Sequence, residues 1–347
     1  MTEEVSTIAH PTETGMTQTT PAEDDAITSS LSRGIRFYFQ CAIVVIGLVA
    51  TATNALVLYA LVASKQHRKH VLICNQNAFD LFASFFLTVT YSLILCNVYF
   101  TVTGSAGYWL CTLLLSESLS SSANTGSVIS LAVISVERYL KIVHRTWSKK
   151  YLRKPVIYSA AALAWITSVI YNLALVFPTT RVIDGICHPY EFWYNPTARV
   201  AHLIWNFALF YVTTLLIFTF CYGRILVVIR RQASVMAAHN TSGGSSNAPS
   251  QFSHIQTSII KTMVFVSLLF AITWLPNYIS VLFIALNPNY QVFESGYYAS
   301  SVFIAYLYFC VNPFIYATKF HPVKEILLRM IPCKKISEED TENVAGT

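Results

Sequence analysis

Charged residues are scarce in this chain. Only 12% of its 347 residues are Asp, Glu, Lys or Arg, whereas soluble domains average about 25%. Because 54% of the residues are hydrophobic and the mean hydropathy is +0.50, the composition excludes an ordinary soluble domain and predicts a membrane protein. The net charge of +6 is not gathered into a basic arm, so we expect no nucleic-acid partner.

Motifs for catalysis and metal binding are missing as well. None of the nine His or eight Cys residues has metal-ligand spacing, and no paired acids indicate acid–base chemistry. We therefore expect neither an enzyme nor a resident cofactor. The chain shows no internal repeat, and its apolar stretches hold few charges, mainly Asp80 and Glu117. Both absences disfavour a transporter or channel, which is kept as the alternative class.

The first 36 residues lack both Asn and an apolar segment. They therefore contain no N-glycosylation acceptor and no signal-peptide core. We expect residues 1–36 to form a disordered extracellular tail, with the first membrane span serving as the signal anchor.

Seven apolar stretches have the length that a helix needs to cross a membrane, which is about 20 residues. They lie at 37–63, 72–98, 109–139, 155–178, 201–229, 260–286 and 296–318. Since the bilayer interior offers no hydrogen-bond partners, each stretch should be a helix. The predicted fold is an all-α bundle of seven transmembrane helices over residues 37–331, followed by a cytoplasmic tail at 332–347.

Lys and Arg residues set the expected orientation. They follow the first, third, fifth and seventh spans, at Lys65, Arg68, Lys69, Arg145, Lys149, Lys150, Arg153, Lys154, Arg230, Arg231, Lys319, Lys324, Arg329, Lys334 and Lys335. The opposite loops hold chiefly Arg181 and Arg199. The positive-inside rule then predicts an extracellular N-terminus and a cytoplasmic C-terminus.

Two segments at the inner face have distinct compositions. Residues 240–250 are rich in Ser, Gly and Asn and predict a flexible linker. Residues 320–331 predict a short amphipathic helix on the membrane surface. Its apolar face comprises Val323, Ile326, Leu327 and Met330. Cys333 follows this helix and is either a palmitoylation site or a plain thiol.

Almost every span carries one landmark residue or motif. These are Gly47, Asn54, Asp80, Cys111, Glu137-Arg138-Tyr139, Trp165, Cys187, Tyr222, Phe270, Trp274-Leu275-Pro276 and Asn312-Pro313-Phe314-Ile315-Tyr316. In this order they make the chain resemble the rhodopsin-like G-protein-coupled receptors, from about Phe37 to Met330. The resemblance implies a plasma-membrane receptor that binds an extracellular ligand and opens a cytoplasmic crevice for a heterotrimeric G protein.

The charged triplet Glu137-Arg138-Tyr139 is the centre of the switch that the resemblance implies. At rest Glu137 would hold Arg138 by a charge-assisted bond. Many relatives add an acid at the inner end of the sixth span, but this chain has Gln256 there. We therefore hypothesise raised ligand-independent activity, since only one of the two acids that would restrain Arg138 is present.

Two proline kinks complete the predicted switch. Pro276 kinks the sixth span near Trp274 and Pro313 kinks the seventh, where Asn312 is expected to satisfy a carbonyl group that the kink frees. The resemblance implies that Tyr316 meets Tyr222 near Arg138 in the active state. In the fifth span Thr214 replaces the proline of most relatives, which leaves a bulge there open. The switch residues are Glu137, Arg138, Tyr139, Tyr222, Phe270, Trp274, Pro276, Asn312, Pro313 and Tyr316.

The resemblance also implies a disulfide between Cys111 and Cys187 at the oxidising outer face. Cys111 precedes Arg138 by 27 residues, which is two more than the family usually shows. Either Cys111 lies just beyond the helix or a bulge intervenes. Cys96, near the outer end of the second span, is a rival partner.

Asp80 is a carboxylate near the middle of the membrane and needs a partner there. The resemblance implies a sodium ion held by Asp80, Ser127, Asn54 and Asn312. Tyr308 and Phe309 stand where relatives usually carry small polar residues, so a hydrogen-bond network between the helices is the alternative.

The ligand class is narrowed by two absences. Amine receptors carry an Asp in the third span where this chain has Ser120, or Ser118 when counted from Cys111, and opsins carry a Lys where it has Tyr306. We therefore expect a peptide or a non-amine small molecule. Glu117 would meet a basic group of the ligand, pair with a neighbouring helix or reach water. The predicted ligand contacts are Glu117, Ser120, Trp274, Tyr306, His188 and Tyr190.

Overall fold

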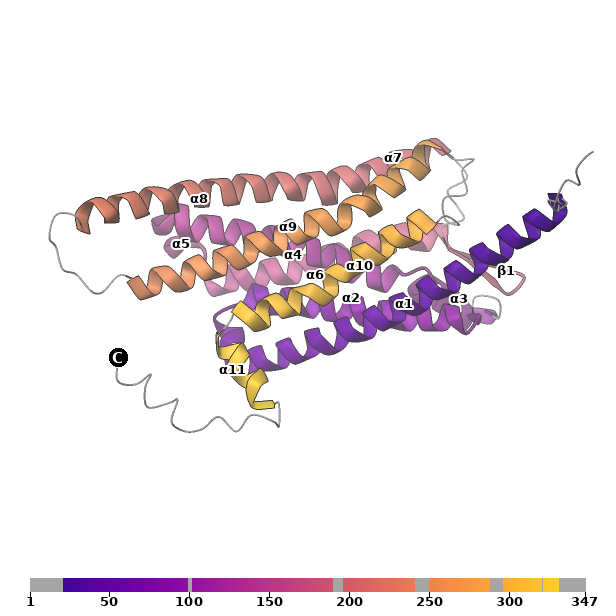
Figure 1. Ribbon diagram of the computed structural model, residues 1–347, viewed down its shortest axis with the longest axis horizontal. Coiled ribbons are helices and arrows are strands. Elements are labelled where there is room, and N and C mark those ends of the chain that lie inside the picture. The colour runs from indigo at the N-terminus through magenta and orange to yellow at the C-terminus, as the bar shows by residue number, and fades with distance from the viewer. Residues whose placement is uncertain are drawn as a thin grey trace, which may run out of the picture.

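A computed structural model describes residues 21–98, 102–189, 196–240, 250–287, 296–319 and 321–330. The helices run side by side as an elongated bundle (Figure 1). The α-helices are α1 (Pro21–Ala63), α2 (Val71–Leu95), α3 (Gly104–Leu110), α4 (Ser118–Val143), α5 (Arg145–Tyr151), α6 (Lys154–Thr179), α7 (Pro196–Asn206), α8 (Thr213–Asn240), α9 (Ser250–Leu286), α10 (Gly296–Lys319) and α11 (His321–Met330). The shorter elements are the 3₁₀ turn η1 (Gln66–Arg68), the π-helical turns η3 (Cys111–Leu115) and η4 (Phe207–Val212), and the strands β1 (Arg181–Ile183) and β2 (Ile186–His188).

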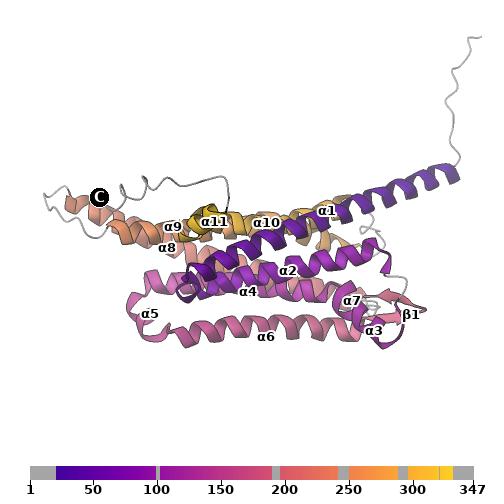
Figure 2. The ribbon, with the colours of Figure 1, turned by 90° about the horizontal axis from the view of Figure 1, so that it is seen from below.

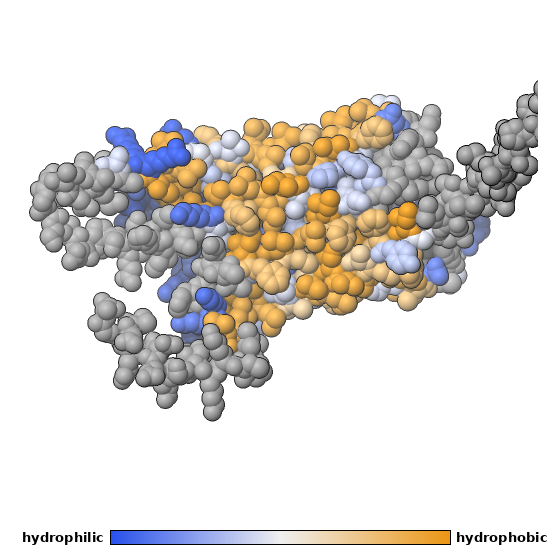
Figure 3. Space-filling model, in the orientation of Figure 1, coloured by the Kyte–Doolittle hydropathy of each residue, from blue (hydrophilic) through white to orange (hydrophobic). Residues whose placement is uncertain are grey.

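Helices occupy all seven predicted spans, but their apolar character differs. Within the described part, five segments are long and apolar enough to cross a membrane: Gly34–Ala63, Val71–Leu95, Lys154–Thr179, Val200–Gln232 and Ile260–Phe283. In α10 the apolar segment is shorter, and α4 is rich in Ser. Because α4 packs against α2, α6 and α8, its serines face other helices. Figure 3 shows the apolar band that crosses the bundle.

The first helix begins earlier than the sequence reading places it. We predict a disordered tail over residues 1–36, yet α1 begins at Pro21. Residues 1–20 lie outside the described part. The sequence Pro21-Ala22-Glu23-Asp24 has a proline and two acids at the start of the helix, where both are favoured. The prediction is therefore wrong for residues 21–36.

Close packing of α2, α4 and α6 fixes the centre of the bundle. A Cβ atom on Gly126 of α4 would lie 2.1 Å from the ring of Phe79 of α2, so only glycine allows this approach. Phe79 also stacks on Trp165 of α6, with 3.9 Å between ring centroids. The Trp165 indole N–H also donates to Asn75 Oδ1 at 2.9 Å. These three helices lie together in Figure 2 as well.

The amphipathic helix is confirmed as α11, which turns away from the end of α10 (Figure 1). Val323 of its predicted apolar face is fully buried, and Ile326 and Leu327 pack against the core. The linker residues 241–249 and Cys333 lie outside the described part. α11 and α5 mark one end of the bundle, and α3, β1 and the start of α7 mark the other (Figure 1).

Candidate functional site

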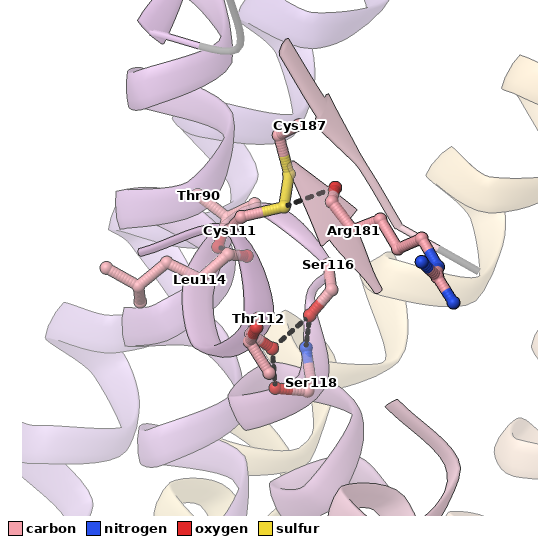
Figure 4. Close-up of a disulfide and its surroundings, with 8 residues drawn as sticks. All are labelled: Thr90, Cys111, Thr112, Leu114, Ser116, Ser118, Arg181 and Cys187. Carbon is pink, nitrogen blue, oxygen red and sulfur yellow. Dashed lines mark hydrogen bonds between the residues drawn. A yellow bond between two sulfur atoms is a disulfide. The ribbon is translucent and has the colours of Figure 1, made fainter. Parts of the chain in front are cut away.

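A short hairpin is tied to the helices at the α3 end. Strands β1 and β2 pair antiparallel, with Val182 opposite Cys187. Between them Asp184 and Gly185 both have positive φ angles, of 49° and 77°, as a two-residue hairpin turn requires. The predicted disulfide joins Cys187 of β2 to Cys111 of η3, with 5.5 Å between their Cα atoms (Figure 4). The Asp-Gly pair is the sequence signal for this hairpin, which we did not predict.

The two additional residues before Arg138 are accommodated by η3 and the break after it. The Ser116 N–H donates to the Cys111 carbonyl oxygen at 2.9 Å, five residues back. Glu117 then has a left-handed backbone with φ of 57° before α4 begins, a conformation that costs a non-glycine residue about 1–2 kcal/mol. The bulge alternative is confirmed, and the prediction of a continuous helix over 109–139 is wrong.

Hydroxyl groups stabilise this break (Figure 4). Ser118 Oγ donates to the Thr112 carbonyl oxygen at 2.8 Å, and Ser116 Oγ donates to the same oxygen. From α2, Thr90 Oγ1 donates to the Leu114 carbonyl oxygen at 2.9 Å. Carbonyl groups that an uninterrupted helix would satisfy are thereby bonded to side chains.

A cavity of about 200 Å³ lies directly beneath the break. Its described lining comes from α2, α4, α9 and α10, and includes Tyr91, Glu117, Ser120, Ser121, Asn124, Trp274, Asn277, Tyr298 and Tyr306. Four predicted ligand contacts thus come together: Glu117, Ser120, Trp274 and Tyr306. His188 lies in β2 and is not among the described lining residues, and Tyr190 lies outside the described part. The cavity residues Tyr91, Asn124, Asn277 and Tyr298 had not been predicted.

Glu117 is held in this cavity by neutral groups. Its Oε2 accepts a hydrogen bond from Tyr306 OH at 3.0 Å, and Tyr91 is a second side-chain partner. None of the described lining residues is Lys, Arg or His. A carboxylate within a membrane-spanning bundle favours a cationic partner. The cavity can therefore accept a positively charged group.

Two further polar atoms are available next to Glu117. Asn124 Oδ1 and Trp274 Nε1 are buried and have no hydrogen-bond partner among the described residues. Buried polar atoms are nearly always bonded in native proteins. The cavity therefore offers one acceptor and one donor beside its carboxylate, which fits a polar ligand group.

An aromatic cluster continues downward from the cavity. Trp274 lies 6.3 Å from Phe270, and Phe270 lies 5.9 Å from Tyr308 and 6.0 Å from Tyr211, measured between ring centroids. Pro276 lies within α9, two residues after Trp274, and cannot donate a backbone hydrogen bond to the preceding turn. Each ring therefore contacts the next from the cavity into the core.

The fifth span has a bulge although it lacks the usual proline. The π-helical turn η4 covers Phe207–Val212, and Thr213 Oγ1 donates to the Ala208 carbonyl oxygen at 2.9 Å, five residues back. Tyr211 on this turn donates to the Ala271 carbonyl oxygen of α9 at 2.8 Å. The turn therefore links the fifth span to α9.

Asp80 is fully buried among hydrogen-bond donors. Its Oδ1 accepts from Ser127 Oγ at 2.7 Å and from Gln76 Nε2 at 3.2 Å, and its Oδ2 accepts from Asn312 Nδ2 at 3.0 Å. These bonds form a hydrogen-bond network around the carboxylate, and the amide oxygens Asn54 Oδ1, Gln76 Oε1 and Asn312 Oδ1 have no hydrogen-bond partner among the described residues. Sodium binding stays a prediction. Gln76 was missed, although it precedes Asp80 by one helical turn.

Asn54 of α1 donates a hydrogen bond to a carbonyl group of α10. Pro313 cannot donate to the Phe309 carbonyl oxygen, four residues earlier. This oxygen accepts instead from Asn54 Nδ2 of α1 at 2.9 Å. The interpretation that Asn312 satisfies the freed carbonyl group is therefore wrong, because the Asn312 amide bonds to Asp80.

At the far end of α4, Glu137 contacts two cations. Its Oε2 lies 3.3 Å from Arg138 Nε, and its Oε1 accepts a hydrogen bond from Lys141 Nζ. Arg138 Nε has no hydrogen bond of good geometry among the described residues, so the predicted Glu137–Arg138 contact is an ion pair. Lys141 was not predicted, although a Glu and a Lys four residues apart on a helix commonly pair.

The remaining switch residues lie around this pair. Tyr222 OH and Ser135 Oγ are 2.9 Å apart, one helical turn before Arg138. Tyr139 OH lies 3.1 Å from His144 Nε2. The side chains of Tyr316 and Gln256 lie outside the described part, so their predicted roles stay predictions.

A comparison with known protein families identifies the family of the chain. Residues 53–316 match the sequence model of the 7 transmembrane receptor (rhodopsin family). The chain belongs to this family. It is therefore a multi-pass membrane receptor of the seven-helix type and not an enzyme. Because the family has seven transmembrane helices, α4 and α10 are also membrane spans. The match favours a receptor over a transporter or channel.

Individual relatives are more distant. Somatostatin receptor type 3 of Mus musculus is 28% identical over 222 residues, which cover 62% of this chain and 51% of that receptor. Somatostatin receptor type 5 of Rattus norvegicus is 27% identical over 279 residues, or 77% and 70% of the two chains. Galanin receptor type 1 of Homo sapiens is 27% identical over 202 residues, or 55% and 52%. The chain spans about half the length of the first of these relatives.

Proposed function

We propose that the protein is a plasma-membrane receptor that binds an extracellular peptide with a basic group and activates heterotrimeric G proteins. The observation that supports this best is the pair of sites on α4. Glu117 lines a cavity that holds no described cation, and Glu137 contacts two cations at the other end. The 20 residues between them span about 30 Å at 1.5 Å per residue, so one helix joins both sites.

The size of the cavity supports a peptide ligand. Its volume of about 200 Å³ is below the roughly 300–1,000 Å³ of typical small-molecule pockets. It therefore has room for one long side chain rather than for a whole ligand, and Glu117 would select a Lys, an Arg or a terminal amine. The relatives named for somatostatin and galanin are in keeping with a peptide.

The orientation follows from charge and redox chemistry. The Lys- and Arg-rich loops lie at the Glu137 end, which favours the cytoplasm. The Cys111–Cys187 disulfide lies at the Glu117 end, which favours the oxidising exterior. Both arguments support an extracellular N-terminus and a cytoplasmic C-terminus.

Activation would begin at Trp274. A ligand group that reaches Glu117 also contacts Trp274, whose ring adjoins Phe270. Movement of these rings at the Pro276 kink would swing the inner half of α9 outward and expose Arg138 to the G protein. Position 256 carries Gln where many relatives carry an acid, which supports our hypothesis of raised ligand-independent activity.

The test is a second-messenger assay in cells that express the protein together with a promiscuous G protein. The probes are a panel of synthetic peptides, each matched with an analogue in which every Lys and Arg is Gln and the terminus is acetylated. We expect a basic peptide to give a response that its neutral analogue lacks and that Arg138→Ala abolishes. A response unchanged by Arg138→Ala at matched surface expression would contradict the proposal.

A further inference from the structure

A second cavity, which we call the basic cavity, lies at the Glu137 end of the bundle. It has a volume of about 530 Å³ and is enclosed by η1, the start of α2, the end of α4 and the start of α6. Its lining includes Arg68, Lys69, Arg138, Lys141 and Lys154, and one carboxylate, Glu137. Five cations therefore face a single anion.

The positive charge of the basic cavity is largely uncompensated. Glu137 is already shared between Arg138 and Lys141. Among the described residues Arg68, Lys69 and Lys154 have no ion-pair partner. The pKa of His70, also in the lining, is lowered to about 4 by burial and by the neighbouring charge of Arg138. An anion with several charges would fit this site.

An apolar groove adjoins the basic cavity. It has a volume of about 280 Å³ and runs along α4 and α6 toward α8. The groove and the basic cavity share four lining residues: Leu72, Glu137, Leu152 and Ile157. Val136 and Val156 of the groove are 39% and 51% exposed, although they lie on helices of the membrane-spanning bundle. The polar site thus continues into an apolar channel on the flank that faces lipid.

We propose that this combined site binds an anionic phospholipid with a phosphorylated headgroup. The headgroup phosphates occupy the basic cavity and the upper part of one acyl chain lies in the groove. A soluble phosphate compound would use only the basic cavity, so the shared lining favours the lipid. That the lipid belongs to the inner leaflet rests on the orientation proposed above, whereas the binding itself does not depend on the ligand or the G protein.

The charge requirement can be tested with purified protein in phosphatidylcholine nanodiscs. The probe is a fluorescent phosphatidylinositol bisphosphate, with phosphatidylserine as a reference of lower headgroup charge. The double variant Lys69→Gln, Lys154→Gln removes two exposed cations from the basic cavity. The matched control Lys149→Gln, Lys150→Gln removes two exposed cations from α5, which do not line it. Each Lys near an anionic lipid contributes about tenfold or less, so we expect roughly ten- to thirtyfold weaker binding only in the first variant.

The groove is tested separately by filling it. Ala160→Phe places a ring among the groove residues, whereas Ala162→Phe places the same ring on an exposed position of α6 outside the groove. We expect Ala160→Phe to weaken binding of the lipid but not of soluble inositol trisphosphate, and Ala162→Phe to change neither. Should Ala160→Phe fail to fold, the affinities of the unmodified protein for the lipid and for soluble inositol trisphosphate still show whether the acyl chain contributes to binding.

The outcomes are distinguishable. A loss confined to the Lys69 and Lys154 variant, with tighter binding of the lipid than of its soluble headgroup, supports the site. Equal losses in both lysine variants would show attraction by general surface charge and overturn it. Equal affinity for inositol trisphosphate and the lipid would show a phosphate site without a lipid, and would also overturn it.

Discussion

The two glutamates on α4 are held in opposite ways. Glu117 is bonded by the neutral hydroxyl group of Tyr306 and by Tyr91, with no cation in the described lining of its cavity. Glu137 contacts Arg138 and Lys141. A carboxylate within the bundle is stabilised when cations of the protein are paired with it. A carboxylate that is bonded only to neutral groups can still form an ion pair with a cation of a ligand. In the function proposed above, Glu117 belongs to a receiving site, which gains a cation from the ligand, and Glu137 to a releasing site, which gives up Arg138.

The backbone conformation also differs between the two glutamates. Glu137 lies within regular α-helix, while Glu117 has a left-handed backbone between η3 and α4. Strained residues of this kind cluster at functional sites. Glu117 has this left-handed backbone and lines the cavity, so in the proposed function it supplies the acid that Ser120 does not.

The largest expected effect comes from removing the charge of the receiving site. Glu117→Gln keeps a hydrogen-bond acceptor for Tyr306 but cannot form an ion pair, so the potency of a basic peptide should fall about 100-fold. Dose–response curves with the active peptide of the panel measure this. Ser121→Ala, which alters a neutral residue of the same cavity, should stay within about threefold. Equal potency in Glu117→Gln would place the basic group elsewhere.

The next effect concerns the kinked helix between the two ends. Asn54→Ala leaves the buried Phe309 carbonyl oxygen without its donor and should lower the unfolding free energy by about 1–3 kcal/mol. The change is measured by thermal unfolding in detergent, with the labelling of buried cysteine thiols as the readout of unfolding. The control Thr53→Ala alters a partly buried residue whose hydroxyl group bonds only within its own helix. An unchanged melting temperature for Asn54→Ala would count against this assignment.

A smaller effect sharpens the account of the releasing site. Lys141→Gln frees one oxygen of Glu137, which can then hold Arg138 more closely. Helix ion pairs of this spacing contribute about 0.3–0.5 kcal/mol, so basal signalling should decrease about twofold. The assay is ligand-independent second-messenger production, with Lys149→Gln as the control. An increase would mean that Lys141 helps to restrain Arg138.

The last prediction concerns the dependence of stability on pH. Burial, followed by the charge of Arg138, lowers the pKa of His70 to about 4 from an ordinary value of 6.5. Between these values the unfolded state binds more protons, so stability should decrease as the pH falls through this window. Melting temperatures at several pH values should decline less steeply in His70→Gln than in the unmodified protein. Parallel curves would show that His70 keeps its ordinary pKa.

Much of the fold can be predicted from the sequence because membrane-spanning helices are long, apolar stretches of the chain. The amphipathic α11 and the Cys111–Cys187 disulfide were likewise predicted correctly. The spacing of Cys111 from Arg138 left two alternatives, a bulge or a Cys111 beyond the helix, and did not give the form of the bulge. The left-handed Glu117 depends on hydroxyl bonds from Thr90 and Ser118, which sequence spacing alone does not specify.

The misassigned contacts were those between helices. Asn54 and Asn312 are both amides at similar depth, and only the rotation of α1 and α10 decides which one reaches the Phe309 carbonyl oxygen. The polar composition of residues 21–36 predicts a disordered tail, whereas Pro21, Glu23 and Asp24 are residues favoured at the start of a helix, and α1 begins there. The Asp184-Gly185 turn had a clear local signal that was not used.

The most direct test of the central claim is basal second-messenger production at matched surface expression in three proteins. The account predicts that Glu137→Gln signals more than the unmodified chain, because Arg138 loses its carboxylate. It also predicts that Arg138→Ala falls to the level of cells without the protein. If Arg138→Ala instead signals as strongly as the unmodified chain, Arg138 is not the switch and the account is contradicted.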